Sequence, residues 1–146
     1  AIAARGETAT PVRERYSRYG KTLITVGSGG DRSAATRPLG LKIELVPLVD
    51  PTTLAAGSRL RVRLLLDGKP LPGALAGAIY AGATASPDSW PLTATTDARG
   101  EAEFLLGHRG PWLVRAVTMQ RRENESGPDA ADWETYWASL TFRLRR

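Results

Sequence analysis

Residues 95–117, TTDARGEAEFLLGHRGPWLVRAV, decide the fold. Residues 97–100 (Asp-Ala-Arg-Gly) form a turn signature, because Asp bonds to nearby backbone and Gly accepts the positive φ of a tight reversal. Apolar and acidic residues then alternate over 101–106, which is typical of a half-buried strand. A second turn signal, 107–111, precedes the strand-like segment 112–117. Together these features predict a β-hairpin inside an all-β domain.

The composition limits the class of protein. With 146 residues, 42% hydrophobic and 24% charged, the chain has the size and balance of one globular domain. It contains no cysteine, so it offers no disulfide or thiol chemistry. No apolar run approaches the roughly 20 residues of a membrane-spanning helix, so no transmembrane segment is expected. The net charge is +5, but the basic residues are scattered along the chain, and we therefore expect no nucleic-acid partner.

Strand patterns separated by turn residues continue along the rest of the chain. Residues 1–20 are predicted to be a flexible or extended lead-in, and residues 21–146 one β-sandwich domain. The dipeptide Asp67-Gly68 is a hairpin turn signal. The predicted strands, besides the two in the opening stretch, are 21–26, 41–45, 59–66, 75–83, 92–96 and 136–144. Seven or eight strands without a long helix predict an antiparallel Ig-like or transthyretin-like β-sandwich.

Alternation within the strands predicts which side chains are buried. Arg59, Arg61 and Arg63 alternate with apolar residues and are expected on a solvated face. Glu101 and Glu103 are likewise expected to face solvent. The core is predicted to contain Leu60, Val62, Leu64, Phe104, Trp112, Val114, Leu140 and Phe142.

Two sets of motifs resemble known families. Segments 66–74 (LDGKPLPGA), 96–100 (TDARG) and 110–114 (GPWLV) resemble the carboxypeptidase-regulatory-like, transthyretin-like sandwich. Segments 15–22 (RYSRYGKT), 39–47 (LGLKIELVP) and 132–142 (DWETYWASLTF) resemble a bacterial family described as the periplasmic component of nickel/cobalt uptake, which is also classed as a domain of unknown function. The first resemblance supports the fold and carries no chemistry.

The second resemblance implies a location, partners and a metal. It implies a periplasmic or secreted protein that works with a membrane transport component or another envelope protein. It also implies nickel or cobalt binding by the full-length protein. The chain resembles the C-terminal portion of such proteins, whose longer N-terminal part usually carries a signal peptide and a histidine-bearing segment. Relatives often have His where this chain has Thr118.

Candidate metal ligands are few in this chain. His108 is the only histidine, and no cysteine accompanies it, whereas transition-metal sites generally use imidazole or thiolate ligands. Asp129, Asp132 and Glu134 are close in sequence and offer oxygen ligands to a hard cation. Their spacing matches no calcium loop, so a solvated acidic loop is the simpler interpretation.

The sequence predicts a protein that is not an enzyme. Its serines lack the G-x-S-x-G context, a single histidine would have to serve any catalytic triad, and no glycine-rich phosphate loop precedes a helix. Four aromatic residues flank charged residues near strand ends, and they form either a structural cluster or a ligand groove: Tyr16, Tyr19, Trp133 and Trp137.

Two functions follow as hypotheses. The first is a non-enzymatic periplasmic accessory or binding protein linked to nickel/cobalt uptake, which rests on the family resemblance. The second is a structural or adhesive β-sandwich module that binds a protein or a glycan, which rests on the fold alone.

Overall fold

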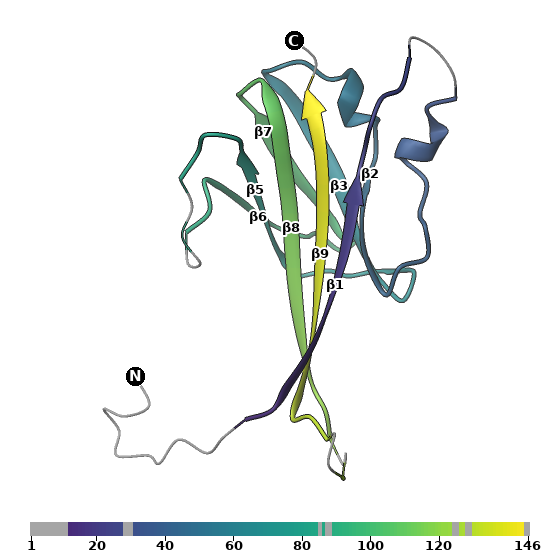
Figure 1. The fold of residues 1–146 in the computed structure, drawn as a ribbon, viewed down its shortest axis with the longest axis vertical. Coiled ribbons are helices and arrows are strands. Elements are labelled where there is room, and N and C mark those ends of the chain that lie inside the picture. The colour runs from purple at the N-terminus through teal and green to yellow at the C-terminus, as the bar shows by residue number, and fades with distance from the viewer. Residues whose placement is uncertain are drawn as a thin grey trace.

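The protein is a β-sandwich, as the sequence predicts (Figure 1). A computed structural model describes residues 12–27, 31–84, 86, 89–123, 126–127 and 130–144. Nine strands lie within these residues, together with two short 3-10 helices, η2 (Ser33–Ala35) and η3 (Pro51–Thr53). Within the described part, no helix is long and apolar enough to span a bilayer.

One layer is a five-stranded sheet in the order β1-β9-β8-β5-β6. Its strands are β1 (Glu14–Thr22), β9 (Trp133–Leu144), β8 (Gly110–Arg121), β5 (Leu75–Tyr80) and β6 (Leu92–Thr95). The β1–β9 pair is parallel and the other pairs are antiparallel. Strands β8 and β9 are the longest, and with β1 they continue below the rest of the sandwich in Figure 1.

The other layer is a four-stranded sheet centred on β3 (Ser58–Leu66). Strand β3 pairs antiparallel with β2 (Ile43–Pro47), with the short β4 (Lys69–Pro70) and with β7 (Glu101–Leu106). The predicted hairpin turn lies between β3 and β4, where Asp67 and Gly68 have φ of 51° and 72°. Two successive positive φ values are typical of a type I′ turn, which matches the twist of the strands it joins.

The two layers meet in one apolar core. All eight predicted core residues are buried in a single cluster, so the alternation of apolar residues correctly predicts the inner faces. Trp112 is the largest buried side chain of this cluster and donates its indole N–H to the carbonyl of His108 at 2.9 Å. That bond satisfies the one polar group of a large buried side chain.

The predicted hairpin in residues 95–117 is wrong, although both of its strands exist. Strand β7 pairs with β3, whereas β8 pairs with β5 and β9. The residues between β7 and β8 therefore cross from one layer to the other instead of closing a hairpin. Alternation identifies the buried face of a strand, but the same face can be buried in either layer.

The turn before β7 is confirmed. Gly100 has φ of +70°, and a Cβ there would lie 2.8 Å from the Leu64 carbonyl oxygen. The Asp97 carboxylate accepts hydrogen bonds from the backbone N–H of Arg99 and Glu101 at 2.8 and 2.9 Å. Both the conformation and the close backbone approach therefore require glycine at position 100.

The first strand begins earlier than predicted. It covers Glu14–Thr22, whereas the pattern places a strand at 21–26 and an extended lead-in before it. The segment 14–22 is extended because it pairs in parallel with β9, which lies more than 100 residues away in sequence. A strand that depends on so distant a partner has only a weak local signal.

Candidate ligand-binding face

Aromatic and arginine side chains cross the outer face of the five-stranded sheet. Trp137 on β9 lies beside Arg18 on β1 in the strand register, and Arg115 projects from β8 on the same side. Tyr16 lies two residues before Arg18, and Trp90 reaches this face from the connection between β5 and β6. We call these five residues the arginine–aromatic face.

Trp90 is seated directly on the sheet. It covers Gly77 of β5, where an added Cβ would lie 2.9 Å from the indole ring. Because Gly77 pairs with Arg115 on β8, the absence of a side chain there brings the indole beside this arginine. The glycine therefore creates the space in which a tryptophan lies flat next to a cation.

Arg115 lies between two tryptophans. Its guanidinium carbon is 4.2 Å from the ring centroid of Trp90 and 5.0 Å from that of Trp137. Arg18 repeats the arrangement two strands away, on β1, at 5.3 Å from the rings of both Trp137 and Tyr16. Each distance is within the range of cation–π attraction. The face is thus a series of rings with a cation between each neighbouring pair.

A cavity of about 200 Å³ opens beside Arg115. Burial lowers the pKa of the Arg115 guanidinium, which nevertheless stays protonated at neutral pH. Among the described residues, no carboxylate lies within ion-pair distance of Arg115 or Arg18. The other lining residues of the cavity are Leu75, Gly77, Trp90, Thr93, Ala116 and Val117.

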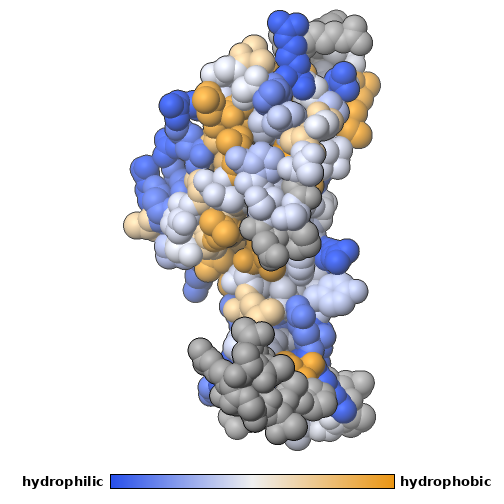
Figure 2. Space-filling view, turned by 90° about the vertical axis from the view of Figure 1, so that its left-hand side faces the viewer, coloured by the Kyte–Doolittle hydropathy of each residue, from blue (hydrophilic) through white to orange (hydrophobic). Residues whose placement is uncertain are grey.

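Exposed apolar side chains lie on this side of the sheet, within the arginine–aromatic face and beside it. Tyr16, Leu75 and Met119 keep 60%, 62% and 53% of their accessible surface. All three lie on the same side of the five-stranded sheet as Trp137 and Arg115, because positions two residues apart in a strand, and positions paired across strands, face the same way. Figure 2 shows the molecule from its β5–β6 side, where apolar patches lie among strongly polar ones.

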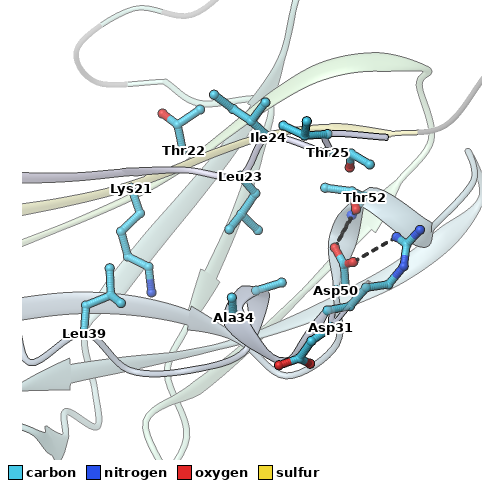
Figure 3. A pocket seen from close by; sticks show the side chains of 13 residues that line it. Lys21, Thr22, Leu23, Ile24, Thr25, Asp31, Ala34, Leu39, Asp50 and Thr52 are labelled. Carbon is cyan, nitrogen blue, oxygen red and sulfur yellow. Dashed lines mark hydrogen bonds and ion pairs between the residues drawn. The ribbon is translucent and has the colours of Figure 1, made fainter. Parts of the chain in front are cut away.

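A second cavity, of about 380 Å³, lies where the chain leaves β1 (Figure 3). Its ionic groups already have partners. Asp50 accepts hydrogen bonds from Thr52 and from Arg32, the latter at 3.3 Å, and the Asp31 carboxylate bonds to the backbone N–H and hydroxyl of Ser33. These carboxylates hold the local chain in place, and they leave little charge for a ligand.

Lys21, which lines that cavity, belongs to a buried ion pair. Lys21 on β1 donates to Glu44 on β2 at 2.7 Å, and both side chains are nearly inaccessible. Alternation predicts an outward Glu44, but residues 39–41 fold over it and donate three backbone N–H groups to its carboxylate. Burial acts to raise the pKa of Glu44, yet Lys21 and these N–H groups hold it below its ordinary value.

The candidate metal ligands do not come together. His108 precedes β8 and stacks on Tyr80 at 3.6 Å between ring centroids. Asp132 and Glu134 lie near the opposite end of β8, because Arg121 pairs with Trp133. Glu134 forms an ion pair with Arg122 at 3.2 Å, and Asp132 accepts the backbone N–H of Arg13. Within the described ranges, no three His, Cys, Asp or Glu residues could share a metal ion.

Two further positions, Asp129 and Thr118, bear on metal binding by this chain. Asp129 lies outside the described residues. Thr118, where the family resemblance implies a histidine in other members, lies on β8 opposite Tyr136 of β9. It is half-buried and lies far along the strand from the end that follows His108.

The structure divides the four predicted groove aromatics. Tyr16 and Trp137 belong to the arginine–aromatic face. Tyr19 packs against the core from the inner side of β1, and Trp133 lies at the start of β9 beside Glu14 and Arg121. A structural role thus accounts for Tyr19, while Tyr16 and Trp137 remain candidates for ligand contact.

Sequence reasoning missed Arg18, Trp90 and Arg115. Arg18 had a local signal, since it lies two residues after Tyr16 and so on the same side of a strand. Arg115 and Trp90 had none, because Trp90 comes from a connection and approaches Arg115 only through the pairing of β5 with β8.

Comparison with known proteins identifies a family. Residues 3–120 match the family described as "Domain of unknown function (DUF4198)". The match extends from before β1 to the next-to-last residue of β8, which is most of the chain, and the chain therefore belongs to this family. No curated protein and no solved structure gives a significant match.

Proposed function

We propose that this member of the DUF4198 family is a non-enzymatic binding module of the bacterial periplasm. It engages another envelope protein through the arginine–aromatic face. The observation that carries the proposal is the pair Arg18 and Arg115, two cations held by aromatic rings and lacking an acidic partner among the described residues. Such a face keeps charge and apolar area available to a partner.

Binding fits this molecule better than catalysis does. The single histidine is exposed and stacked on Tyr80, far along β8 from Asp132 and Glu134. The acids Glu44 and Glu101 are engaged by Lys21 and by arginines, and their pKa values are lowered, away from those of a general acid at neutral pH. The supported role is therefore recognition by a rigid surface.

We place this recognition in nickel or cobalt uptake, on the strength of the family resemblance described above. The acceptor is then a membrane transport component or another envelope protein. In this proposal the sandwich serves as the docking part, and metal binding belongs elsewhere in the full-length protein, since His108 and the acidic residues lie apart.

Site-specific photocrosslinking in cells tests the docking face. The photoreactive residue replaces Thr93, which is exposed beside the Arg115 cavity, and in a matched control it replaces Leu105, which is exposed on the outer face of β7. We expect one defined protein adduct from position 93, lost when Arg115→Gln is added, and none from position 105. Equal adducts from both positions, or adducts from position 105 alone, contradict the proposal.

A further inference from the structure

We propose that the arginine–aromatic face binds an extended, acidic protein segment, with one carboxylate of that segment entering the cavity beside Arg115. This inference rests on the proposed function and adds the chemistry of the partner. It follows from the charge of the face, the residue types around it and the spacing of its two arginines.

The charge argument starts from the state of Arg115. The rings of Trp90 and Trp137 attract its cation and limit its movement, but they do not neutralise it. An arginine held in this way offers a planar fork of N–H donors, which matches the two oxygens of a carboxylate. Since Arg115 lines a cavity of about 200 Å³, a carboxylate can approach it there.

The outer face of this sheet carries an excess of positive charge. Its outward strand positions hold four arginines and one acid among the described residues: Arg18, Arg115, Arg121, Arg143 and Glu14. On the four-stranded sheet, in contrast, the three outward arginines of β3 all form ion pairs, with two glutamates of β7. The larger excess of cations therefore lies on the outer face of the five-stranded sheet, and it is complementary to an acidic partner.

The residue types favour a protein as the partner. The centres of protein interfaces are enriched in Tyr, Trp, Met and Arg and depleted of Lys. The outer face of the five-stranded sheet carries Tyr16, Met119 and the two tryptophans, and no lysine occupies an outward strand position in the described residues. Trp, Tyr and Arg are also the residues that most often dominate binding energy.

The spacing of the arginines defines a probe. Arg18 and Arg115 are two strands apart and offset by two residues, because Arg115 pairs with Ser139 and Ser139 with Gly20. Strand spacing and rise then place their Cα atoms about 12 Å apart. An extended peptide places side chains four residues apart on one side at about 13 Å. Two glutamates with that separation can reach both arginines.

Fluorescence anisotropy with a labelled peptide tests the inference on the full chain. The probe is a short extended peptide with glutamates four residues apart, and its control has glutamines at the same two positions. We expect saturable binding of the glutamate peptide and at least about tenfold weaker binding of the glutamine peptide, the effect of losing one or two charge-assisted hydrogen bonds. Added salt should weaken the glutamate complex.

Matched variants locate the site. Arg115→Gln should weaken glutamate-peptide binding about tenfold, and Arg18→Gln should also weaken it. Arg59→Gln removes the same charge from the opposite face and should leave binding unchanged. Thermal unfolding of each variant confirms that it is folded, and Arg115→Lys tests whether the planar fork is needed, because it keeps the charge.

Four results would overturn the inference. Equal binding of the two peptides would show that the face is not specific for acids, even if the crosslinking experiment confirms it as the docking face. An equal loss with Arg59→Gln would place binding elsewhere. Tighter binding of an oligogalacturonate than of the glutamate peptide would identify an acidic glycan as the ligand. Displacement of the glutamate peptide by inorganic phosphate at a concentration similar to that of the peptide would show that the site binds anions in general. That result would also overturn the inference.

Discussion

The two outer faces of the sandwich use arginine in opposite ways. On the four-stranded sheet, Glu101 receives both Arg61 and Arg63, and Arg59 pairs with Glu103 at 2.7 Å. On the five-stranded sheet, Arg18 and Arg115 lie over aromatic rings and have no acidic partner among the described residues. A pattern of alternating arginines in a strand therefore does not show by itself whether these arginines form ion pairs or bind a ligand. The neighbouring strand decides whether their charge is neutralised or remains available to a ligand.

The largest expected effect tests whether both faces depend on one core. Phe104 is buried in the cluster that joins the two sheets. Phe104→Ala should lower the free energy of unfolding by about 3–5 kcal/mol, the usual range for a buried phenylalanine. Denaturant unfolding measures this value, and Leu105→Ala, on the exposed side of the same strand, is the matched control with a small effect. An unchanged stability in Phe104→Ala would show that the core is misplaced.

A smaller effect concerns the buried pair of Lys21 and Glu44, which joins β1 to β2. The pKa of Glu44 is lowered in the folded protein, so its contribution is fully present above its ordinary value of 4.5 and is lost as pH falls through the folded-state value. Stability should therefore decrease below about pH 4.5. In Glu44→Gln this part of the decrease should disappear. An identical pH dependence in both proteins would contradict the assignment.

The next prediction addresses the contrast between the two faces directly. Arg61→Gln breaks an ion pair with the buried Glu101 and should lower the midpoint of thermal unfolding. Arg115→Gln breaks no ion pair within the described residues and should change the midpoint less, while it weakens binding of the acidic peptide. A larger decrease of the midpoint in Arg115→Gln than in Arg61→Gln would contradict the view that arginines stabilise the fold on one face and bind a ligand on the other.

The smallest expected effect is that of metal on this chain alone. We expect weak binding of Ni²⁺ or Co²⁺, because His108 lies far from Asp132 and Glu134. Isothermal titration measures it, with His108→Ala as the control. A one-to-one site tighter than about 1 μM, or about −8 kcal/mol, would contradict this prediction. Such a site would also replace the arginine–aromatic face as the main candidate for function.

Much of the fold was predictable because its signals are local. The alternation in residues 58–66 identifies both the buried residues and the arginine face of β3. The Asp67-Gly68 and 97–100 turns are encoded by residues that accept positive φ. The hairpin in residues 95–117 failed for the opposite reason, since nothing local distinguishes a turn within a sheet from a crossing between sheets.

The candidate site was predictable only in part. The position of Tyr16 and Trp137 among charged residues makes them candidates for either a structural cluster or a ligand groove, and both lie on the proposed docking face. Their role depends on Arg18 and Arg115, which approach them across strand pairs. The burial of Glu44 is likewise not predictable from the sequence. Glu44 occupies an outward position of β2 and is buried only because residues 39–41 cover it.

The sequence by itself determined most of the strands, the turns at 67–68 and 97–100, and the inner face of most strands, because these depend on alternation and on backbone conformations within a few residues. Only the tertiary structure decided which strands pair, and so which arginines are neutralised by glutamates and which lie between aromatic rings. The parallel pairing of β1 with β9 brings Arg18 to Trp137, and the pairing of β5 with β8 brings Gly77 and Trp90 to Arg115. Those contacts join residues far apart in sequence, so no local pattern encodes them.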